Sequence, residues 1–177
     1  MRFRDTRPAA THANLMDFAH AAAVLEGQSF RRPTGEWPTT LFHVDADGKR
    51  HISHLRMPAT QASAALSIQI ALKASRSVEA LLRASAWEAF VPREFAGAAD
   101  VNCGGLAGGA GPDFDAERDG VEVLLFLHVG DGFAVTRSAR VLRHPAAPPV
   151  LGALSEITGE GLDVGGIFAD ALRLGIG

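Results

Sequence analysis

"VEVLLFLHVGDGFAVTRSARVLRHP", residues 121–145, decides the fold, because it carries the strongest strand signal in the chain. Apolar and β-branched residues run up to a Gly-Asp-Gly turn at 130–132 and resume after it, which predicts a β-hairpin. We expect Val129 to face Phe133 across this turn. The nearly continuous apolar run at 123–127 predicts a central strand that is covered on both faces. The protein is therefore built around a sheet with a buried middle.

A second hairpin is predicted by "LFHVDADGKRHISHL", residues 41–55. Asp45 and Gly48 suit a type I turn followed by a left-handed glycine, the common three-residue hairpin loop. This turn places His43 opposite His51, so both imidazoles share one face of the hairpin, where a helix, a partner or water could lie. The other face is apolar, and we expect it to lie against the core. Its residues are Phe42, Val44 and Ile52.

Two helices are predicted, one on each side of this hairpin, and a short one near the end of the chain. Residues 11–27 carry apolar side chains at helical spacing, and Gly27 offers a natural end. These side chains are Leu15, Phe18, Ala22 and Leu25. "ATQASAALSIQIALKAS", residues 59–75, predicts an alanine-rich helix with two apolar stripes, which should contact the protein on more than one side. The stripes are Leu66 with Ile70, and Ile68 with Leu72. The last helix is predicted within 162–175.

Two stretches between the hairpins carry less regular patterns. "VEALLRASAWEAFV", residues 78–91, has helical propensities, yet its alternation also fits a strand, so both structures stay open. Residues 96–119 are rich in glycine and contain few large apolar residues, so burial does not offset the entropy of ordering them. We expect a long mobile loop there, and loops of this kind are usually functional or disordered.

The composition points to one soluble domain that spans residues 1–177, a length that allows a full core and is short for two domains. The net charge of -3 argues against a nucleic-acid partner, because phosphate binding needs a concentrated basic surface. No run of about 18 apolar residues suits a membrane span, and no signal-peptide pattern is present, so we expect a cytoplasmic protein. The single cysteine, Cys103, excludes an internal disulfide and a cysteine-based zinc site.

The histidine pair is the main candidate for a site. His43 and His51 would place two imidazoles within reach of one metal ion, with Asp45 as a third ligand. His54 falls on the opposite face of a regular strand. The interpretation that we favour is that these residues face solvent or a partner and hold no metal. The glycine-rich stretch lacks the Lys-Ser/Thr pair of a phosphate loop, so no cofactor is expected.

Two classes of function fit these patterns. The first is a non-enzymatic binding or accessory domain that could form a homodimer, because no acid, base, nucleophile and oxyanion donor converge in the sequence. The second is a small hydrolase or metal-dependent enzyme that uses the His43/His51 face, with the 96–119 loop as a lid. The sequence identifies neither a ligand nor a partner.

Three stretches resemble an uncharacterised family of small bacterial and phage-associated proteins. They are "WPTTLFHVDADGK" (37–49), "SAWEAFV" (85–91) and "PDFDAERDGVEVLLFLH" (112–128). Members of that family combine a hairpin, a helix, a strand and a late hairpin preceded by an acidic loop. The resemblance implies architecture only, because it brings no activity with it, and it favours a strand at 78–91.

Together these patterns predict a single α+β domain in the order α-β-β-α-β-loop-β-β-α. We expect a mixed sheet of about five strands, with the helix at 60–75 crossing over one face. The right-handed crossover rule then places the strand at 80–91 next to or near the first hairpin, parallel to one of its strands.

Overall fold

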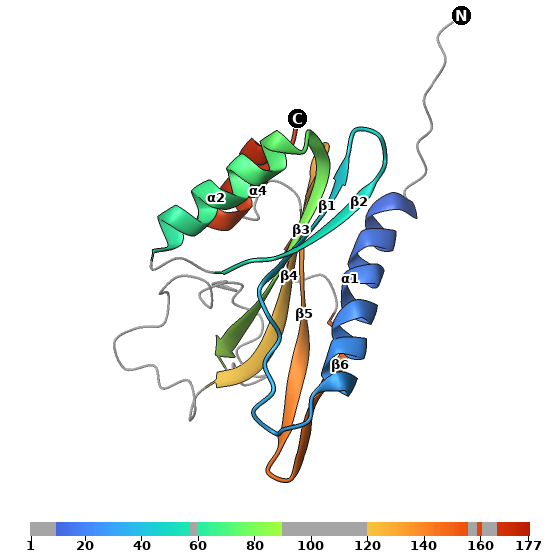
Figure 1. The fold of residues 1–177 in the computed structure, drawn as a ribbon, viewed down its shortest axis with the longest axis vertical. Helices are drawn as coiled ribbons and strands as arrows, with labels where there is room; N and C mark the ends of the chain where they lie inside the picture. The colour runs from blue at the N-terminus through green and yellow to red at the C-terminus, as the bar shows by residue number, and fades with distance from the viewer. Residues whose placement is uncertain (1–9, 57–59, 90–119, 156–158, 161–165) are drawn as a thin grey trace, which may run out of the picture.

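The computed structural model of the protein describes residues 10–56, 60–89, 120–155, 159–160 and 166–177 (Figure 1). Their helices and strands, in chain order, are α1 (Ala10–Ser29), β1 (Thr40–Asp45), β2 (Arg50–His54), α2 (Gln61–Ala74), β3 (Ser77–Ala89), β4 (Gly120–Gly130), β5 (Phe133–His144), β6 (Ala147–Leu154), β7 (Gly159–Glu160) and α4 (Ile167–Gly175). Within these ranges, no helix combines the length and the apolar character needed to cross a membrane.

One curled sheet runs through the molecule in the order β2-β1-β3-β4-β5-β6, and β7 pairs with β5. The predicted α+β class is confirmed, but the predicted five-stranded mixed sheet is wrong. After α2 the chain returns on the far side of β1, so β2 and β3 point the same way with β1 between them. Every strand pair among the described residues is consequently antiparallel.

Residues 78–89 of the stretch that fitted both a helix and a strand belong to strand β3, and the rest of it lies outside the described residues. Both faces of this strand are buried along residues 79–84, where Leu81 packs in the core on the α1 side and Leu82 in the core on the α2 side. Burial on a sheet thus overrides the helical propensity of an alanine-rich sequence. The loop expected at 96–119 lies outside the described residues.

Strand β6 is not predicted by the sequence, because Pro148 and Pro149 indicate an end to the preceding hairpin. Proline lacks the amide donor that a central strand needs, but an edge strand tolerates it. β6 lies at the end of the strand order, beyond β5. Its pairing with β5 contains register shifts, as expected for an irregular edge.

The predicted register of the first hairpin is confirmed. His43 lies opposite His51, and Phe42 lies opposite Ile52. The amide of Gly48 donates to the carbonyl of Asp45 at 2.9 Å, and Gly48 has a φ of 80°, as the turn requires.

The predicted register of the second hairpin is wrong by one residue. Gly130, rather than Val129, faces Phe133, so the turn shortens to Asp131 and Gly132. The expectation that the run 123–127 is covered on both faces is confirmed, because all five of its residues are buried. A strand that is apolar on both faces fits either register, so its pattern could not choose between them.

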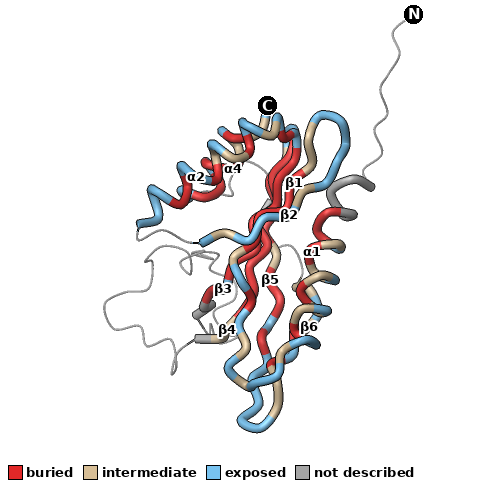
Figure 2. The backbone as a smooth tube through the Cα atoms, in the orientation of Figure 1, coloured by how far each residue is buried: buried red, intermediate tan, exposed pale blue. Residues whose placement is uncertain are grey.

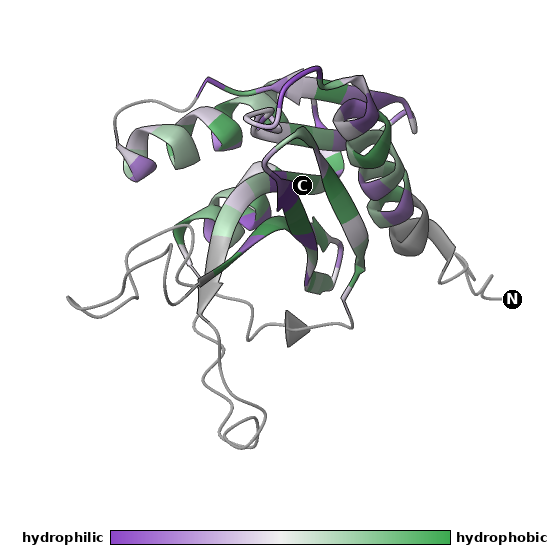
Figure 3. Ribbon diagram, turned by 90° about the horizontal axis from the view of Figure 1, so that it is seen from below, coloured by the Kyte–Doolittle hydropathy of each residue, from purple (hydrophilic) through white to green (hydrophobic). Residues whose placement is uncertain are grey.

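The sheet separates two helix layers, with α1 on one face and the pair α2 and α4 on the other (Figure 1). Figure 2 shows buried backbone along the middle strands, and Figure 3 shows the curl of the sheet with hydrophobic residues along its strands. On the α1 side the core contains Leu15, Met16, Ala19, Ala23, Phe42, Leu81, Leu124 and Phe126. On the other side it contains Leu41, Ile68, Leu72, Leu82, Leu127, Phe168 and Leu172.

Three predictions about faces need correction. Ile52 was expected in the core, but it is 52% exposed because β2 is the outer strand of the sheet. Leu25 is 66% exposed, whereas the other residues of the predicted stripe, Leu15, Phe18 and Ala22, lie in or against the core on the α1 side. Leu66 and Ile70 are also exposed, so α2 contacts the described protein through one stripe rather than two.

A buried arginine ties α1 to the sheet. Arg83 on β3 is 0% exposed, and its Nη2 donates to Oε2 of Glu26 on α1 at 2.7 Å. The same nitrogen donates to the carbonyl of Pro38 at 3.2 Å and to Oγ1 of Thr40 at 2.8 Å. The guanidinium carbon also lies 5.6 Å from the centroid of the Phe42 ring. The Arg83 guanidinium on β3 is therefore bonded both to the end of α1 and to the segment that leads into β1.

Helix α1 does not end at Gly27, as the sequence suggested, but continues to Ser29. A Cβ atom added at Gly27 would lie 2.7 Å from Cζ2 of Trp37. Trp37 is 4% exposed, and its Nε1 donates to the carbonyl of Ala23 at 2.7 Å. Gly27 thus allows the indole to pack closely on the helix.

Replacing this glycine should destabilise the fold. Gly27→Ala gains up to about 1 kcal/mol as a helix residue, but the overpacking against Trp37 costs about 1–3 kcal/mol. We expect a net loss in the free energy of unfolding, measured by urea denaturation. Gln28→Ala, at the neighbouring exposed position, is the control and should not destabilise the chain. A Gly27→Ala chain more stable than wild type would show that the indole moves freely.

Candidate functional site

The predicted site residues lie together at the end of the first hairpin. The rings of His43 and His51 stack, with centroids 4.8 Å apart and planes 12° from parallel. Nε2 of His51 lies 2.8 Å from Oδ2 of Asp45, so the carboxylate binds His51. His54 is separate from this group, since its Nδ1 lies 3.1 Å from Oγ1 of Thr40.

The two stacked imidazoles have different surroundings. His43 is 4% exposed, so the expectation that it faces solvent is wrong, and its Nδ1 is 2.8 Å from Oγ of Ser77. Burial lowers the pKa of His43, and the nearby His51 lowers it further, while Asp45 opposes both effects. The hydrogen bond with His51 holds the pKa of Asp45 below its usual value, with help from backbone amides of the turn. Neutral His43 and ionised Asp45 are therefore favoured.

The stacking of the His43 and His51 rings does not suit a metal ion shared by both. The lone pair of an imidazole nitrogen lies in the plane of its ring, so two nearly parallel rings direct their nitrogens side by side rather than toward one point. One nitrogen of His43 faces Ser77, and one nitrogen of His51 faces Asp45. Among the described residues, no three His, Cys, Asp or Glu side chains are grouped to hold a metal ion, and a protein zinc site needs at least three. The segment 96–119, expected as a lid, lies outside those residues.

The hydrogen bond between Ser77 and His43 has the arrangement of a nucleophile and its base. Ser77 is 0% exposed, however, and His43 is almost as deeply buried. Neither residue lines the neighbouring cavity, which is bordered by Val78 and Gly177. In the described part of the chain this hydroxyl is closed to a substrate, and the pair serves as a buried link between β1 and β3.

A second buried pair was not predicted. Nε2 of His128 lies 2.7 Å from Oε1 of Glu79, and the two residues are 1% and 8% exposed. The His128 ring also contacts Phe133 edge to face, with centroids 5.0 Å apart. The sequence held a signal, because His128 is the one polar residue in the apolar run 123–129. A histidine in a buried strand needs a polar partner.

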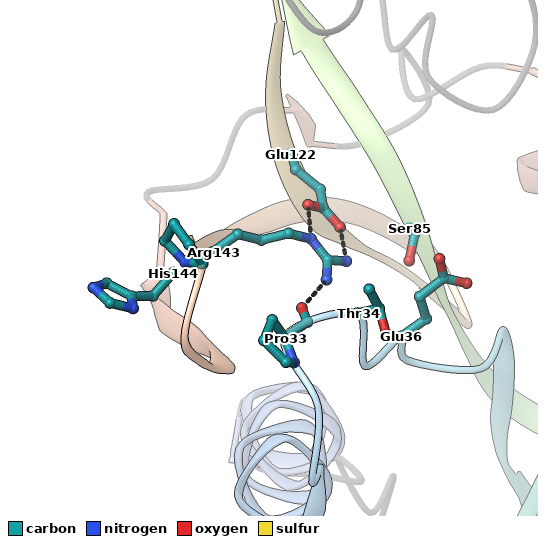
Figure 4. Close-up of a pocket in the computed structure, with 8 residues that line it drawn as sticks. Pro33, Thr34, Glu36, Ser85, Glu122, Arg143 and His144 are labelled. Carbon is teal, nitrogen blue, oxygen red and sulfur yellow. Dashed lines mark hydrogen bonds and ion pairs between the residues drawn. The ribbon is translucent and has the colours of Figure 1, made fainter.

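An open cavity of about 650 Å³ lies between the turn that follows α1 and strands β3, β4 and β5 (Figure 4). Its polar lining includes Glu36 from the turn, Ser85 from β3, Glu122 from β4 and Arg143 from β5. None of these residues is part of the histidine group.

Arg143 holds the cavity together. Its Nε and Nη2 donate to the two carboxylate oxygens of Glu122 at 2.6 and 2.7 Å, which makes a bidentate pair. Its Nη1 donates to the carbonyls of Pro33 at 2.9 Å and Gly35 at 3.0 Å. The hydrogen bond with Glu122 raises the pKa of Arg143, so the charge is permanent. Sequence spacing gave no sign of this contact, because Arg143 and Pro33 are 110 positions apart.

The chain matches no protein-family model, no curated protein and no solved structure. The resemblance of three short stretches to a bacterial and phage-associated family stays a prediction, and so does the cytoplasmic location.

The histidine stack yields a prediction about pH. His43 should titrate below its ordinary value of 6.5, because burial and His51 oppose its protonation. The unfolded chain then binds more protons than the folded chain between these two pKa values, so stability should fall as the pH drops below about 6.5. NMR titration of the ring protons, with and without EDTA, measures the pKa, and His43→Gln should remove this part of the pH dependence. We expect EDTA to change nothing. A His43 pKa at or above 6.5, or a titration that EDTA alters, would contradict this account.

Proposed function

We propose that this chain is a non-enzymatic binding domain whose ligand lies in the cavity held by Arg143 and Glu122. The observation that supports this most is the separation of the cavity from the two buried hydrogen-bonded pairs. Ser77 with His43, and Glu79 with His128, are buried away from it, and its lining includes none of these four residues. A pocket without a hydrogen-bonded nucleophile and base among its described residues fits recognition better than reaction.

The cavity is also held in shape before a ligand arrives. The bonds from Arg143 to Glu122 and to the turn carbonyls fix β4, β5 and the turn to one another. The turn is packed from behind, since a Cβ added at Gly35 would lie 2.6 Å from the ring of Phe30. That ring contacts Trp37 with centroids 4.9 Å apart. A preformed site loses less conformational freedom on binding, which favours affinity.

A small hydrolase or metal-dependent enzyme at the His43/His51 face is the second candidate. The hydrogen bond between Ser77 and His43 is the observation that favours it. This candidate requires a movement that opens Ser77 to solvent, because its side chain is 0% exposed.

An NMR screen of ¹⁵N-labelled protein tests the binding function with small fragments that carry an ammonium, a carboxylate or a neutral amide. We expect at least one class to shift the amides of Thr34, Glu36 and Ser85, which line the cavity. Arg143→Gln should weaken that binding roughly ten-fold, because the turn loses charge-assisted hydrogen bonds. Arg173→Gln, on the distant helix α4, is the matched control and should leave affinity unchanged.

Two outcomes would argue against a ligand in the cavity or in favour of the enzyme. Shifts confined to His43, His51 and Ser77 would argue against the cavity. Hydrolysis of p-nitrophenyl acetate that Ser77→Ala abolishes would support the hydrolase, and loss of that activity in EDTA would support the metal-dependent form.

The outer face of α2 supports a homodimer. Leu66 and Ile70 lie one turn apart on this face and are 56% and 58% exposed. Lys73 is the only charged residue of the helix, although a solvated helix face usually carries several charges. Two copies of the chain could meet at this face through Leu66 and Ile70, with Lys73 of the same face at the end of the helix as the one charge that each copy brings from α2.

Light scattering coupled to size exclusion tests this assembly. We expect a dimer mass for the wild-type protein and a monomer mass for Ile70→Lys, because a charge buried in an apolar interface is costly. Leu142→Lys is the control, since Leu142 is 57% exposed on β5 and should not affect the mass. A wild-type chain that elutes as a monomer at every concentration would contradict the homodimer.

A further inference from the structure

The cavity carries one negative charge that the described residues do not compensate. Every guanidinium nitrogen of Arg143 is engaged, two with Glu122 and one with turn carbonyls, so that ion pair is neutral as a unit. Glu36 also lines the cavity and forms no hydrogen bond or ion pair within the described part of the chain. Its charge adds to the larger effect of Glu122 in raising the pKa of Arg143. A positively charged ligand group would complement Glu36.

Strand β3 extends beyond the strand beside it. Its pairing with β1 ends where Arg83 faces Thr40, whereas its pairing with β4 continues to Ala89. Along Ala84–Ala89, the outer backbone groups have no strand partner among the residues that the structure describes. An edge of this kind accepts an extended peptide as an added strand.

Ser85 belongs both to the cavity and to the unpaired edge of β3. It is exposed, it lies on the unpaired part of β3, and its side chain lines the cavity near Glu36 (Figure 4). Residues that lie opposite each other in paired strands send their side chains to the same face of the sheet. A peptide residue opposite Ser85 would therefore send its side chain into the cavity, toward Glu36.

We propose that an extended peptide adds to β3 along Ala84–Ala89 and places a lysine or arginine side chain in the cavity against Glu36. This inference rests on the proposed binding function and names its partner. An acidic peptide would meet the repulsion of Glu36, and a nucleic acid would bring phosphates to a negative cavity on a chain of net charge -3. A basic, extended peptide satisfies the charge and the backbone edge together.

The probe is the peptide Ac-Thr-Val-Thr-Lys-Thr-Val-Thr-NH2, whose β-branched residues favour an extended chain. Its binding, followed by ¹H–¹⁵N NMR, should shift the amides of Glu36 and of residues 84–86. A peptide with Glu in place of Lys should bind roughly ten-fold more weakly, and Glu36→Gln should weaken the Lys peptide roughly three-fold. Glu36→Lys should reverse the preference. Asp47→Asn removes a charge from the exposed turn of the first hairpin and should leave affinity unchanged.

Two N-methylated probes test strand addition separately from charge. Methylation of alternate residues removes the amide donors on one side of the peptide only. One pattern should abolish binding and the other should preserve it, because a single side of an added strand faces β3. Equal loss with both patterns, or lysine amide binding as tightly as the peptide, would overturn strand addition.

The remaining outcomes separate this inference from the function on which it rests. Equal affinity for the Lys and Glu peptides, with shifts in the cavity, would overturn the basic partner and leave the binding function standing. No shift in the cavity with any peptide or fragment would overturn both.

Discussion

The buried charge of Arg83 is the interaction on which the arrangement around the cavity depends. A guanidinium withdrawn from water is costly unless a carboxylate and other oxygens replace the solvent. Glu26 on α1 supplies the carboxylate, and Pro38 and Thr40 supply two further oxygens, all bonded to Nη2, while the buried Nε and Nη1 have no hydrogen-bond partner among the described residues. Because Arg83 is also the last residue of β3 that pairs with β1, these bonds determine where the chain from α1 enters the sheet. The position of the turn at 33–36 and the unpaired stretch of β3 follow from that entry point.

Strand β3 carries a buried polar link to each of its neighbours. Ser77 reaches His43 on β1, and Glu79 reaches His128 on β4. A slip of one residue would turn these side chains to the opposite face and leave buried polar groups without partners. The central strands are apolar on both faces and lack the alternation that usually sets register. We infer that these polar links determine the register of the central strands.

The sequence predicted well what local chemistry determines. Asp45 and Gly48 specify a turn, and the register of the first hairpin followed from them. The run 123–127 specifies burial but not register, and the alanine-rich stretch 78–91 fitted two structures until its neighbouring strands were known. The histidine group was predictable because its members share one hairpin. The cavity was not, because Arg143 closes it through contacts with a turn that no local pattern connects to β5.

The bond between Arg143 and Pro33 spans 110 positions, so the cavity exists only when the first and last thirds of the chain are folded together. Neither an isolated hairpin nor a fragment from one side of the chain contains it. Any ligand of the cavity consequently binds the folded chain and not the unfolded one, and mass action converts its affinity into added stability. The melting temperature of the whole protein thereby becomes a reporter of occupancy, which can rank partners before the identity of the natural one is settled.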